Sequence, residues 1–239
     1  MRPMSERPPG SYGFDAPRLL AFPVLLMIAG VVQTVLTGSL WPLLGVAAIG
    51  ACCALGFYAS RQGKFVVWAR LLDGLGLDGD EEVLDLGCGR GALLISAALR
   101  VPKGRAVGVD LWRTGDQSGN DPEATLRNAA AAGVADVVSV ETANVTALPF
   151  PDESFDLVVS NIALHNLKAA ADRDKAVTEA VRVLRPGGRL LLADLSHTHQ
   201  YEQRARELGL QDVSRRGLGW RQWWSGPWLP TRLVSARKP

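Results

Sequence analysis

A glycine-rich turn, Gly87-Cys88-Gly89-Arg90-Gly91, is the segment of this sequence best suited to binding chemistry. It follows a short apolar run at 83–86 and precedes a stretch rich in Ala and Leu, so it joins a predicted buried strand to a predicted helix. Glycine lets the backbone turn sharply and approach a ligand closely, and the following helix begins with free N–H groups. The turn therefore predicts a nucleotide-binding loop, with a purely structural turn as the alternative.

Two carboxylates near this turn narrow the choice of ligand. Asp110 ends the next predicted strand, about 20 residues further on, where a carboxylate can accept both hydroxyls of a ribose. Asp85 lies two residues before Gly87, where it would repel a diphosphate and attract a cation. The G-x-G-x-G spacing also differs from the G-x-G-x-x-G of dinucleotide binders. The pattern therefore favours a nucleoside that carries a positively charged tail.

The elements that must position these residues alternate along the second part of the chain. Strands are predicted at 83–86, 105–110, 137–141, 155–160, 189–194, 211–216 and 231–238, and helices at 92–100, 122–132, 172–184 and 201–208. Strands that alternate with helices favour parallel pairing through right-handed crossovers. With 47% hydrophobic residues and three cysteines, the composition excludes a disordered or disulfide-rich chain.

Four blocks of the sequence together resemble class I S-adenosylmethionine (SAM)-dependent methyltransferases, in particular the type 11-like group that acts on small molecules. The segment 83–91 resembles the family's first motif, and 107–110 is similar to the second, whose acid binds ribose. The segment 144–156 resembles the stretch before the fourth strand, and 184–189 the turn before the fifth. The resemblance extends over about residues 83–238, and it depends on all the blocks together.

This resemblance implies an α/β, Rossmann-like fold with a seven-stranded sheet of order 3-2-1-4-5-7-6, whose last strand is antiparallel. It implies SAM as the cofactor, with S-adenosylhomocysteine as its product. The implied cofactor-binding residues are Asp85, Gly87, Cys88, Gly89, Gly91, Asp110, Leu111, Asn144, Val145, Ser160 and Asn161.

Several of these residues receive specific roles from the resemblance. Leu111 is expected to pack on the adenine, and Ser160 and Asn161 to approach the methionine part. Asn144 stands where the family usually has Asp, and its side-chain carbonyl can accept the same hydrogen bond from the adenine amino group.

His165 is the candidate catalytic residue. It lies five residues beyond the fourth predicted strand, in a stretch where many small-molecule members of the family carry a His. A general base or a substrate contact is one interpretation, and a hydrogen-bonded structural His is the other. Methyl transfer from a sulfonium depends mainly on alignment, so a side-chain nucleophile is not required. No Cys/His cluster has the spacing of a metal site, and no metal is predicted.

Residues 19–60 contain no Asp, Glu, Lys, Arg or His. One membrane-spanning helix needs about 20 apolar residues, so this segment fits two short spans, at 19–36 and 43–60. Gly38 and Pro42 mark a turn between them. The run is much longer than the apolar region of a secretory signal. A hairpin that lies in one leaflet, or packs as a soluble core, remains the alternative.

The flanks of this hairpin are basic, and they predict its orientation. The basic residues are Arg2, Arg7 and Arg18 before it, and Arg61, Lys64 and Arg70 after it. Basic flanks stay on the cytoplasmic side, so the N-terminus and the catalytic domain are both expected there.

Four of the seven Trp residues lie between the last two predicted strands, at Trp220, Trp223, Trp224 and Trp228. Basic residues outnumber acidic ones from residue 202 onward, which suits an anionic membrane surface. The alternative is that these rings pack in the domain's own core. The insert at 112–120 is longer than a usual βα loop, and it is either a wall of the pocket or a surface loop.

The sequence thus predicts an N-terminal tail (1–18), a two-helix transmembrane hairpin (19–60) and a methyltransferase domain (61–239), with 61–80 as a short linker to the bilayer. The expected function is membrane-anchored transfer of a methyl group from SAM to a small lipophilic acceptor, whose identity and accepting atom the sequence leaves open. One alternative is a catalytically silent nucleotide-binding scaffold at the membrane. The other is an NAD-dependent oxidoreductase, which the glycine spacing and Asp85 disfavour. The net charge of +2 gives no electrostatic footprint for nucleic acid.

Overall fold

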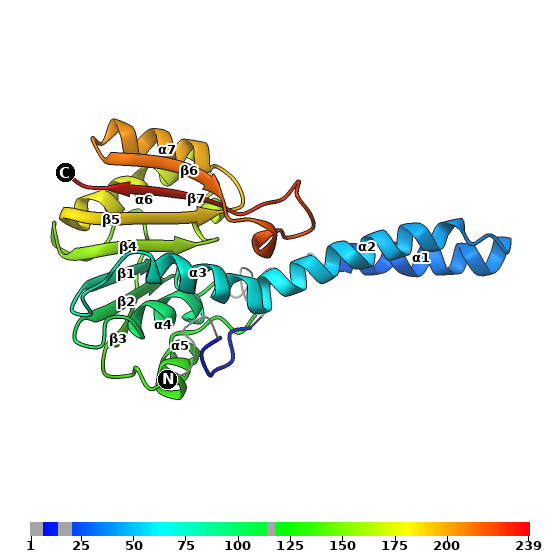
Figure 1. Cartoon of the computed structure of the whole chain (residues 1–239), viewed down its shortest axis with the longest axis horizontal. Coiled ribbons are helices and arrows are strands. Elements are labelled where there is room, and N and C mark those ends of the chain that lie inside the picture. Colours follow the sequence, from blue (N-terminus) through cyan, green and yellow to red (C-terminus); the bar gives the residue numbers. More distant parts are fainter. Residues whose placement is uncertain (1–6, 14–20, 114–117) are drawn as a thin grey trace.

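Seven strands form one mixed sheet in the order β3-β2-β1-β4-β5-β7-β6, as expected (Figure 1). The computed structural model describes residues 7–13, 21–113 and 118–239. Strand β7 runs antiparallel to both β5 and β6, and the other pairs are parallel. The strands are β1 (Glu82–Leu86), β2 (Arg105–Asp110), β3 (Val138–Thr142), β4 (Phe155–Asn161), β5 (Leu184–Asp194), β6 (Gln211–Gly217) and β7 (Arg232–Arg237).

Helices cover both faces of the sheet, so the residues of its central strands are mostly buried whichever face they point to. One face packs against α3 (Lys64–Asp73), α4 (Ala92–Ala98) and α5 (Pro122–Ala132). The other packs against α6 (Ala170–Val183) and α7 (Thr198–Glu207). Successive strand residues point to opposite faces, so Leu191 joins the first core and Leu190 the second. Short turns of helix occur at η2 (Ala59–Gly63), η3 (Leu164–Asn166) and η4 (Trp220–Gln222).

Two apolar helices, α1 (Ala21–Thr37) and α2 (Trp41–Tyr58), form a hairpin that projects from the α/β domain (Figure 1). Gly38, at φ +67°, ends α1, and Pro42 stands in the first turn of α2. Gly30 allows the helices to approach, because a Cβ there would lie 2.7 Å from a methyl of Val46. The two helices lie where the sequence predicts them, although the expected start at Leu19 is outside the described residues.

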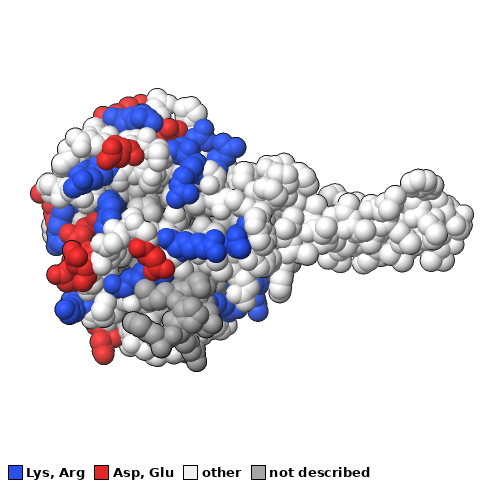
Figure 2. All heavy atoms as spheres, in the orientation of Figure 1, with Lys and Arg blue, Asp and Glu red and all other residues white. Residues whose placement is uncertain are grey.

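The outer surface of this hairpin is apolar and uncharged. Leu36, Trp41 and Val35 are each more than three-quarters exposed. The face seen in Figure 2 carries no Lys, Arg, Asp or Glu, whereas both signs are scattered over the α/β domain. One described helix, the continuous stretch Trp41–Asp73, is long and apolar enough to cross a membrane, by length and composition only. Helix α1 is apolar but shorter.

The segment expected to be the linker, 61–80, is helical over its first part. Helix α2 continues through the π-helical turn η2 into α3 without a break. The segment contains no proline, and Phe65, Trp68 and Leu72 bury their side chains on the sheet, so packing favours continued helix. Hairpin and domain therefore share one helix.

Two glycines let the loop before β7 lie against this shared helix. A Cβ at Gly56 would collide with the backbone oxygen of Trp224, and one at Gly63 with that of Arg221. The ring of Trp220 in the same loop stacks on Tyr58, with centroids 5.3 Å apart. The loop thus clamps the base of the hairpin.

The described part of the N-terminal tail, residues 7–13, docks on the α/β domain. Ser11 exchanges two hydrogen bonds with the Asn128 side chain, at 2.8 and 3.0 Å. Tyr12 is 1% exposed, and its ring meets the Phe65 ring edge-on at 5.1 Å. Both ends of the hairpin are therefore held to the same body.

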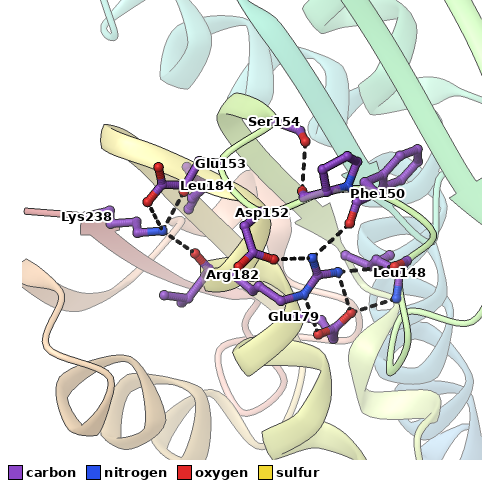
Figure 3. A network of polar contacts seen from close by, with 11 residues as sticks. Leu148, Phe150, Asp152, Glu153, Ser154, Glu179, Arg182, Leu184 and Lys238 are labelled. Atoms are coloured by element: carbon purple, nitrogen blue, oxygen red, sulfur yellow. Dashed lines mark hydrogen bonds and ion pairs between the residues drawn. The ribbon is translucent and has the colours of Figure 1, made fainter.

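A polar network centred on Arg182 fixes the segment before β4 to helix α6 (Figure 3). The guanidinium donates to the backbone oxygens of Phe150 and Leu148, at 2.8 and 3.1 Å, and pairs with Asp152 at 2.7 Å. It also bonds both oxygens of Glu179, which accepts the Leu148 amide as well. The network holds in place a segment that begins at the cavity described below.

Candidate functional site

A cavity of about 870 Å³ opens at the carboxyl ends of β1, β2 and β4, where open α/β sheets bind their ligands. Most of the predicted site residues line it, which brings together segments far apart in the sequence. They are Asp85, Gly87, Cys88, Gly89, Asp110, Leu111, Asn144, Val145, Asn161 and His165. Gly91 and Ser160 do not line it.

The glycine turn adopts a backbone that requires glycine. Gly87, Gly89 and Gly91 all have positive φ, at +72°, +51° and +80°. The amides of Gly87 and Cys88 both donate to Val109 of β2, at 2.8 and 3.1 Å, which pins the loop beside the second strand. A Cβ on Gly87 would collide with Ala163, so this position also keeps the cavity open.

Gly91 and Ser160 do not line the cavity, and both have structural roles beside it. Gly91 precedes helix α4 in a left-handed conformation, and a Cβ there would lie 2.8 Å from Thr125. The Ser160 hydroxyl is buried and donates to the backbone oxygen of Leu86 at 2.8 Å. It therefore fastens β4 to β1, beneath the cavity.

Asp85 carries a buried carboxyl group whose charged form a cationic ligand would stabilise. It is 1% exposed, and neither oxygen has a hydrogen-bond partner of good geometry among the described residues. Burial raises the pKa of its carboxyl to about 8; the nearby Leu94 amide lowers this pKa in part, and the Asp110 carboxylate raises it further. A cationic ligand would compensate the buried charge, as the positively charged methionine part of SAM requires.

Asp110 holds the glycine turn in addition to facing the cavity. One oxygen accepts the Gly89 amide at 2.9 Å, and the other accepts the Trp112 amide at 2.7 Å and the Asn120 side chain at 3.2 Å. A carboxylate offers about four acceptor positions, so about one is left for a ribose hydroxyl. The sequence indicates the ribose contact but not this support of the loop.

The remaining predicted cofactor residues lie on two rims of the cavity. Leu111 is 41% exposed, as suits a residue that packs on a flat ligand. The Asn144 side-chain oxygen accepts the Thr146 amide at 3.0 Å, which shapes the turn and still leaves a lone pair. The Asn161 side-chain oxygen accepts the Trp68 indole N–H at 2.8 Å. Arg113 and Asn120 of the long insert also line the cavity, and its centre, 114–117, lies outside the described residues.

His165 forms a pair with Asp194, a residue that sequence reasoning misses. The distance from His165 Nδ1 to an Asp194 oxygen is 2.6 Å, and the His165 amide donates to the other oxygen at 2.9 Å. Asp194 is 2% exposed and also accepts the Leu195 amide and the Tyr201 hydroxyl, at 2.7 and 3.2 Å. Because Nδ1 is engaged, Nε2 is the ring nitrogen that would exchange a proton with a ligand.

Burial and the Asp194 carboxylate both raise the pKa of the Tyr201 hydroxyl, which therefore stays protonated and keeps donating to Asp194. The only sequence signal for Asp194 is its position at the end of a predicted strand.

The cavity extends beyond the α/β domain to the base of the hairpin. Phe22, Pro23 and Leu26 of α1 and Ala48, Ile49, Cys52, Cys53 and Gly56 of α2 line its far part. Trp224 and Leu229 of the loop before β7 complete that part. The sequence assigns these hairpin residues to the membrane alone, because contacts between distant segments leave no local pattern.

The described residues offer no group of three or more His, Cys, Asp or Glu side chains that could hold a metal ion. The polar groups that line the cavity instead include the carboxylates of Asp85 and Asp110, Lys64, the glycine turn and His165, which is paired with Asp194. Such a set can bind a cationic nucleoside and accept a proton beside it.

Parts of this chain are similar in sequence to known proteins. The family model for the methyltransferase domain matches residues 84–192. The demethylmenaquinone methyltransferase of Symbiobacterium thermophilum is 35% identical over 117 residues, which cover 48% of this chain and 43% of that protein. The ubiquinone/menaquinone biosynthesis C-methyltransferase UbiE of Pasteurella multocida is 37% identical over 132 residues, which cover 54% of this chain and 46% of that protein. The match thus spans less than half the length of these curated relatives.

The fold is also that of solved methyltransferases. A geranyl diphosphate methyltransferase in complex with SAM aligns with a TM-score of 0.58 at 18% identity, covering 76% of this chain and 89% of that one. A likeness at this identity shows the fold alone. Together with the family match over residues 84–192, the sheet order and the buried Asp85 beside the glycine turn make this part of the chain similar to class I SAM-dependent methyltransferases, whose cofactor is SAM.

Proposed function

We propose that this protein is a membrane-anchored enzyme that transfers a methyl group from SAM to a small lipophilic acceptor. The observation that carries the proposal is the shape of the cavity, which joins the Asp85 and glycine-turn end to an apolar wall made by the hairpin. A small soluble acceptor would not need that wall. Two of the relatives are a demethylmenaquinone methyltransferase and a ubiquinone/menaquinone biosynthesis C-methyltransferase, which supports an acceptor with a ring and an apolar tail.

In this proposal His165 acts as the general base. The acceptor gives up a proton to Nε2, and the electron density left behind forms a bond to the methyl carbon. SAM, held by the glycine turn and Asp110, would supply that methyl group, and its sulfur would keep the electron pair of the bond that is broken. Asp194 stabilises the imidazolium that forms, because one of its carboxylate oxygens lies 2.6 Å from Nδ1. The apolar wall excludes water from the reacting atoms.

The proposed membrane anchor is the hairpin of α1 and α2. Its exposed side chains are apolar, and a collar at its base carries interfacial residues. In the collar, Trp220 is 47% exposed and Trp228 69% exposed, and the Arg221 guanidinium lies 4.6 Å from the Trp220 ring centre. Trp and Arg side chains suit the headgroup region of an anionic membrane.

The proposed orientation has the N-terminus and the catalytic domain in the cytoplasm, where SAM is made. Support comes from the docking of residues 7–13 on the domain, which keeps the described tail on the same side as the sheet. The basic residues Arg61 and Lys64 at the base point the same way. The tip at Ser39 would then lie on the opposite side.

Methyl transfer is tested with the full-length protein in membranes. Radiolabelled methyl-SAM added to the wild-type protein should label a component of the lipid extract. His165→Ala should lower that rate by about 10²–10⁴-fold while calorimetry shows SAM bound as before. SAM binding without label in any extract would contradict the proposal and favour a silent scaffold, and NAD binding in place of SAM would favour an oxidoreductase.

Orientation is tested separately by labelling single cysteines with a membrane-impermeant reagent. Cysteine introduced at Ser5 and at a C-terminal tag should react from the same side, with Ser39→Cys on the other. Reaction of Ser39→Cys from the cytoplasmic side would show that the hairpin lies in one leaflet.

A further inference from the structure

The cavity follows one face of the helix that joins the hairpin to the domain. Its lining residues on this helix are Ile49, Cys52, Cys53, Gly56 and Lys64, so they repeat at helical spacing. From Ile49 to Lys64 the helix rises about 22 Å, at 1.5 Å per residue. The cavity therefore runs lengthwise along the hairpin base and does not merely touch it.

Exposure on this face of the joining helix increases away from the sheet. Lys64, at the domain end, is 3% exposed and Gly56 is buried, whereas Ile49, Cys52 and Cys53 are partly exposed. On α1, within the described residues, Leu26 is 43% exposed and Phe22, which lies nearer the base, is 68% exposed. The cavity is thus closed beside the sheet and opens between the bases of α1 and α2.

The chemistry of the lining changes in the same direction. Asp85, His165 and Lys64 stand at the closed end, and the open end has only apolar or weakly polar side chains. Small residues predominate on α2 there (Ala48, Cys52, Cys53 and Gly56), which leaves room for an occupant. The total volume of about 870 Å³ lies near the top of the ~300–1,000 Å³ range of ligand pockets, enough for a cofactor with a second ligand beside it.

We infer that the base of the hairpin is the tail-binding section of the acceptor site, in which Phe22, Leu26, Ile49 and Cys53 hold an unbranched or isoprenoid tail while the reacting head lies beside His165. The inference rests on the proposed methyl transfer and gives the hairpin a second role, as a wall of the active site. A tail that leaves the open end would pass directly into lipid.

Shape, and not hydrophobicity, would give this section its selectivity. A tail dissolved in the bilayer gains little from moving to another apolar surface, because lipid is equally apolar. The section would therefore discriminate acceptors by whether their tail fits the groove. Filling the groove should exclude long tails and leave short ones unaffected.

The test uses the full chain in lipid nanodiscs with two acceptor analogues that share one ring and differ in tail length. Ile49→Trp and Cys53→Trp each place a large ring in the groove. We expect the ratio of kcat/KM for the long-tailed to the short-tailed analogue to fall at least tenfold in each variant. SAM binding should stay near wild type, which shows that the variants are folded.

Val35→Trp is the matched control, because Val35 is 77% exposed near the hairpin tip and does not line the cavity. It adds the same ring to the lipid-facing surface and should leave the ratio unchanged. A photoreactive group at the end of the long tail gives a readout independent of turnover. It should label peptides from 21–58, and labelling should fall in Ile49→Trp.

The outcomes separate this inference from the function on which it rests. No transfer to either analogue by the wild-type protein would overturn the proposed function. Transfer with an unchanged ratio in both tryptophan variants, or labelling confined to the α/β domain, would overturn the inference and leave the hairpin as a tether alone.

Discussion

Replacing Asp85 by Asn should stabilise the protein without ligand and weaken its hold on SAM. The carboxyl is 1% exposed, and burial raises its pKa from 3.8 to about 8. The folded protein therefore binds more protons than the unfolded chain between about pH 4 and pH 8, so the free energy of unfolding falls as pH rises through that window, by up to ~1.4 kcal/mol per pH unit. Asp85→Asn removes this penalty, and its melting temperature without ligand should exceed that of wild type above pH 6.

SAM binding should show the opposite effect. At pH 7 most Asp85 carboxyls are protonated, and a cationic ligand must expel that proton at a cost of about 1 kcal/mol. Wild-type affinity should rise by up to about tenfold per unit as pH rises toward 7, and SAM binding at pH 7 should release a proton from most molecules. Asp85→Asn removes the attraction between the carboxylate and the cationic ligand, which is worth ~2–5 kcal/mol. It also removes the cost of expelling the proton, so the net loss of SAM-binding free energy is ~1–4 kcal/mol.

Calorimetry in buffers of different ionisation enthalpy measures the affinity and the proton release together. Asp212→Asn, on the exposed strand β6, is the control and should change neither. The reasoning is refuted if wild-type affinity does not depend on pH, or if Asp85→Asn binds SAM as tightly as wild type. A lower melting temperature of the ligand-free variant at pH 8 would contradict the pKa assignment itself.

Three further substitutions test the supports of the site. Gly87→Val, whose side chain would meet Ala163 in a backbone of positive φ, should abolish SAM binding in calorimetry while circular dichroism shows a folded protein. Asp194→Asn should lower kcat by about 10²–10⁴-fold with little change in the KM for SAM. If kcat and the affinity for SAM fell equally, Asp194 would contribute to folding alone. Arg182→Met removes hydrogen bonds to two backbone oxygens and to Glu179, and should reduce the free energy of unfolding by about 2 kcal/mol in urea titrations; an unchanged midpoint would show that the network contributes nothing.

The α/β core could be predicted closely because its signals are local. The strand at 105–110 and the helix at 122–132 have the predicted bounds, the latter because Asp121 caps it and Pro122 suits its first turn. The Asp121 side chain accepts the Ala124 amide at 2.8 Å. Sheet order came from the family resemblance, since nothing in a strand's own sequence specifies its neighbours.

The parts that could not be predicted depend on contacts between distant segments. Asp194 meets His165 across 29 positions of sequence, and Asp110 supports Gly89 across 21. The helix at 61–73 could not be predicted for a different reason. The charges of Arg61 and Lys64 suggest the end of an apolar segment, but charge does not interrupt a helix. The membrane assignment of 19–60 was based on hydropathy, which identifies apolar faces but not what they contact.

The π-helical turn η2 sets the rotational phase between hairpin and domain. Gly56 and Lys64 both line the cavity although they are eight positions apart on the joining helix. In an uninterrupted α-helix eight residues rotate the chain about 80° beyond two full turns. A π turn accommodates one extra residue, which returns the eighth close to the starting face.

If these eight residues kept ordinary α-helical pitch, they would turn the chain about 100° further than they do with the π turn, one residue's share of a turn. Everything before the turn would then be rotated by about 100° relative to the sheet, so that Ile49 and Cys53 would face away from the cavity and other hairpin side chains would take their place. Removing one residue from the turn, such as the exposed Gln62, would instead leave a helix of ordinary pitch in the present phase. The pitch of this one turn thus decides which stripe of an almost uniformly apolar hairpin faces the cavity.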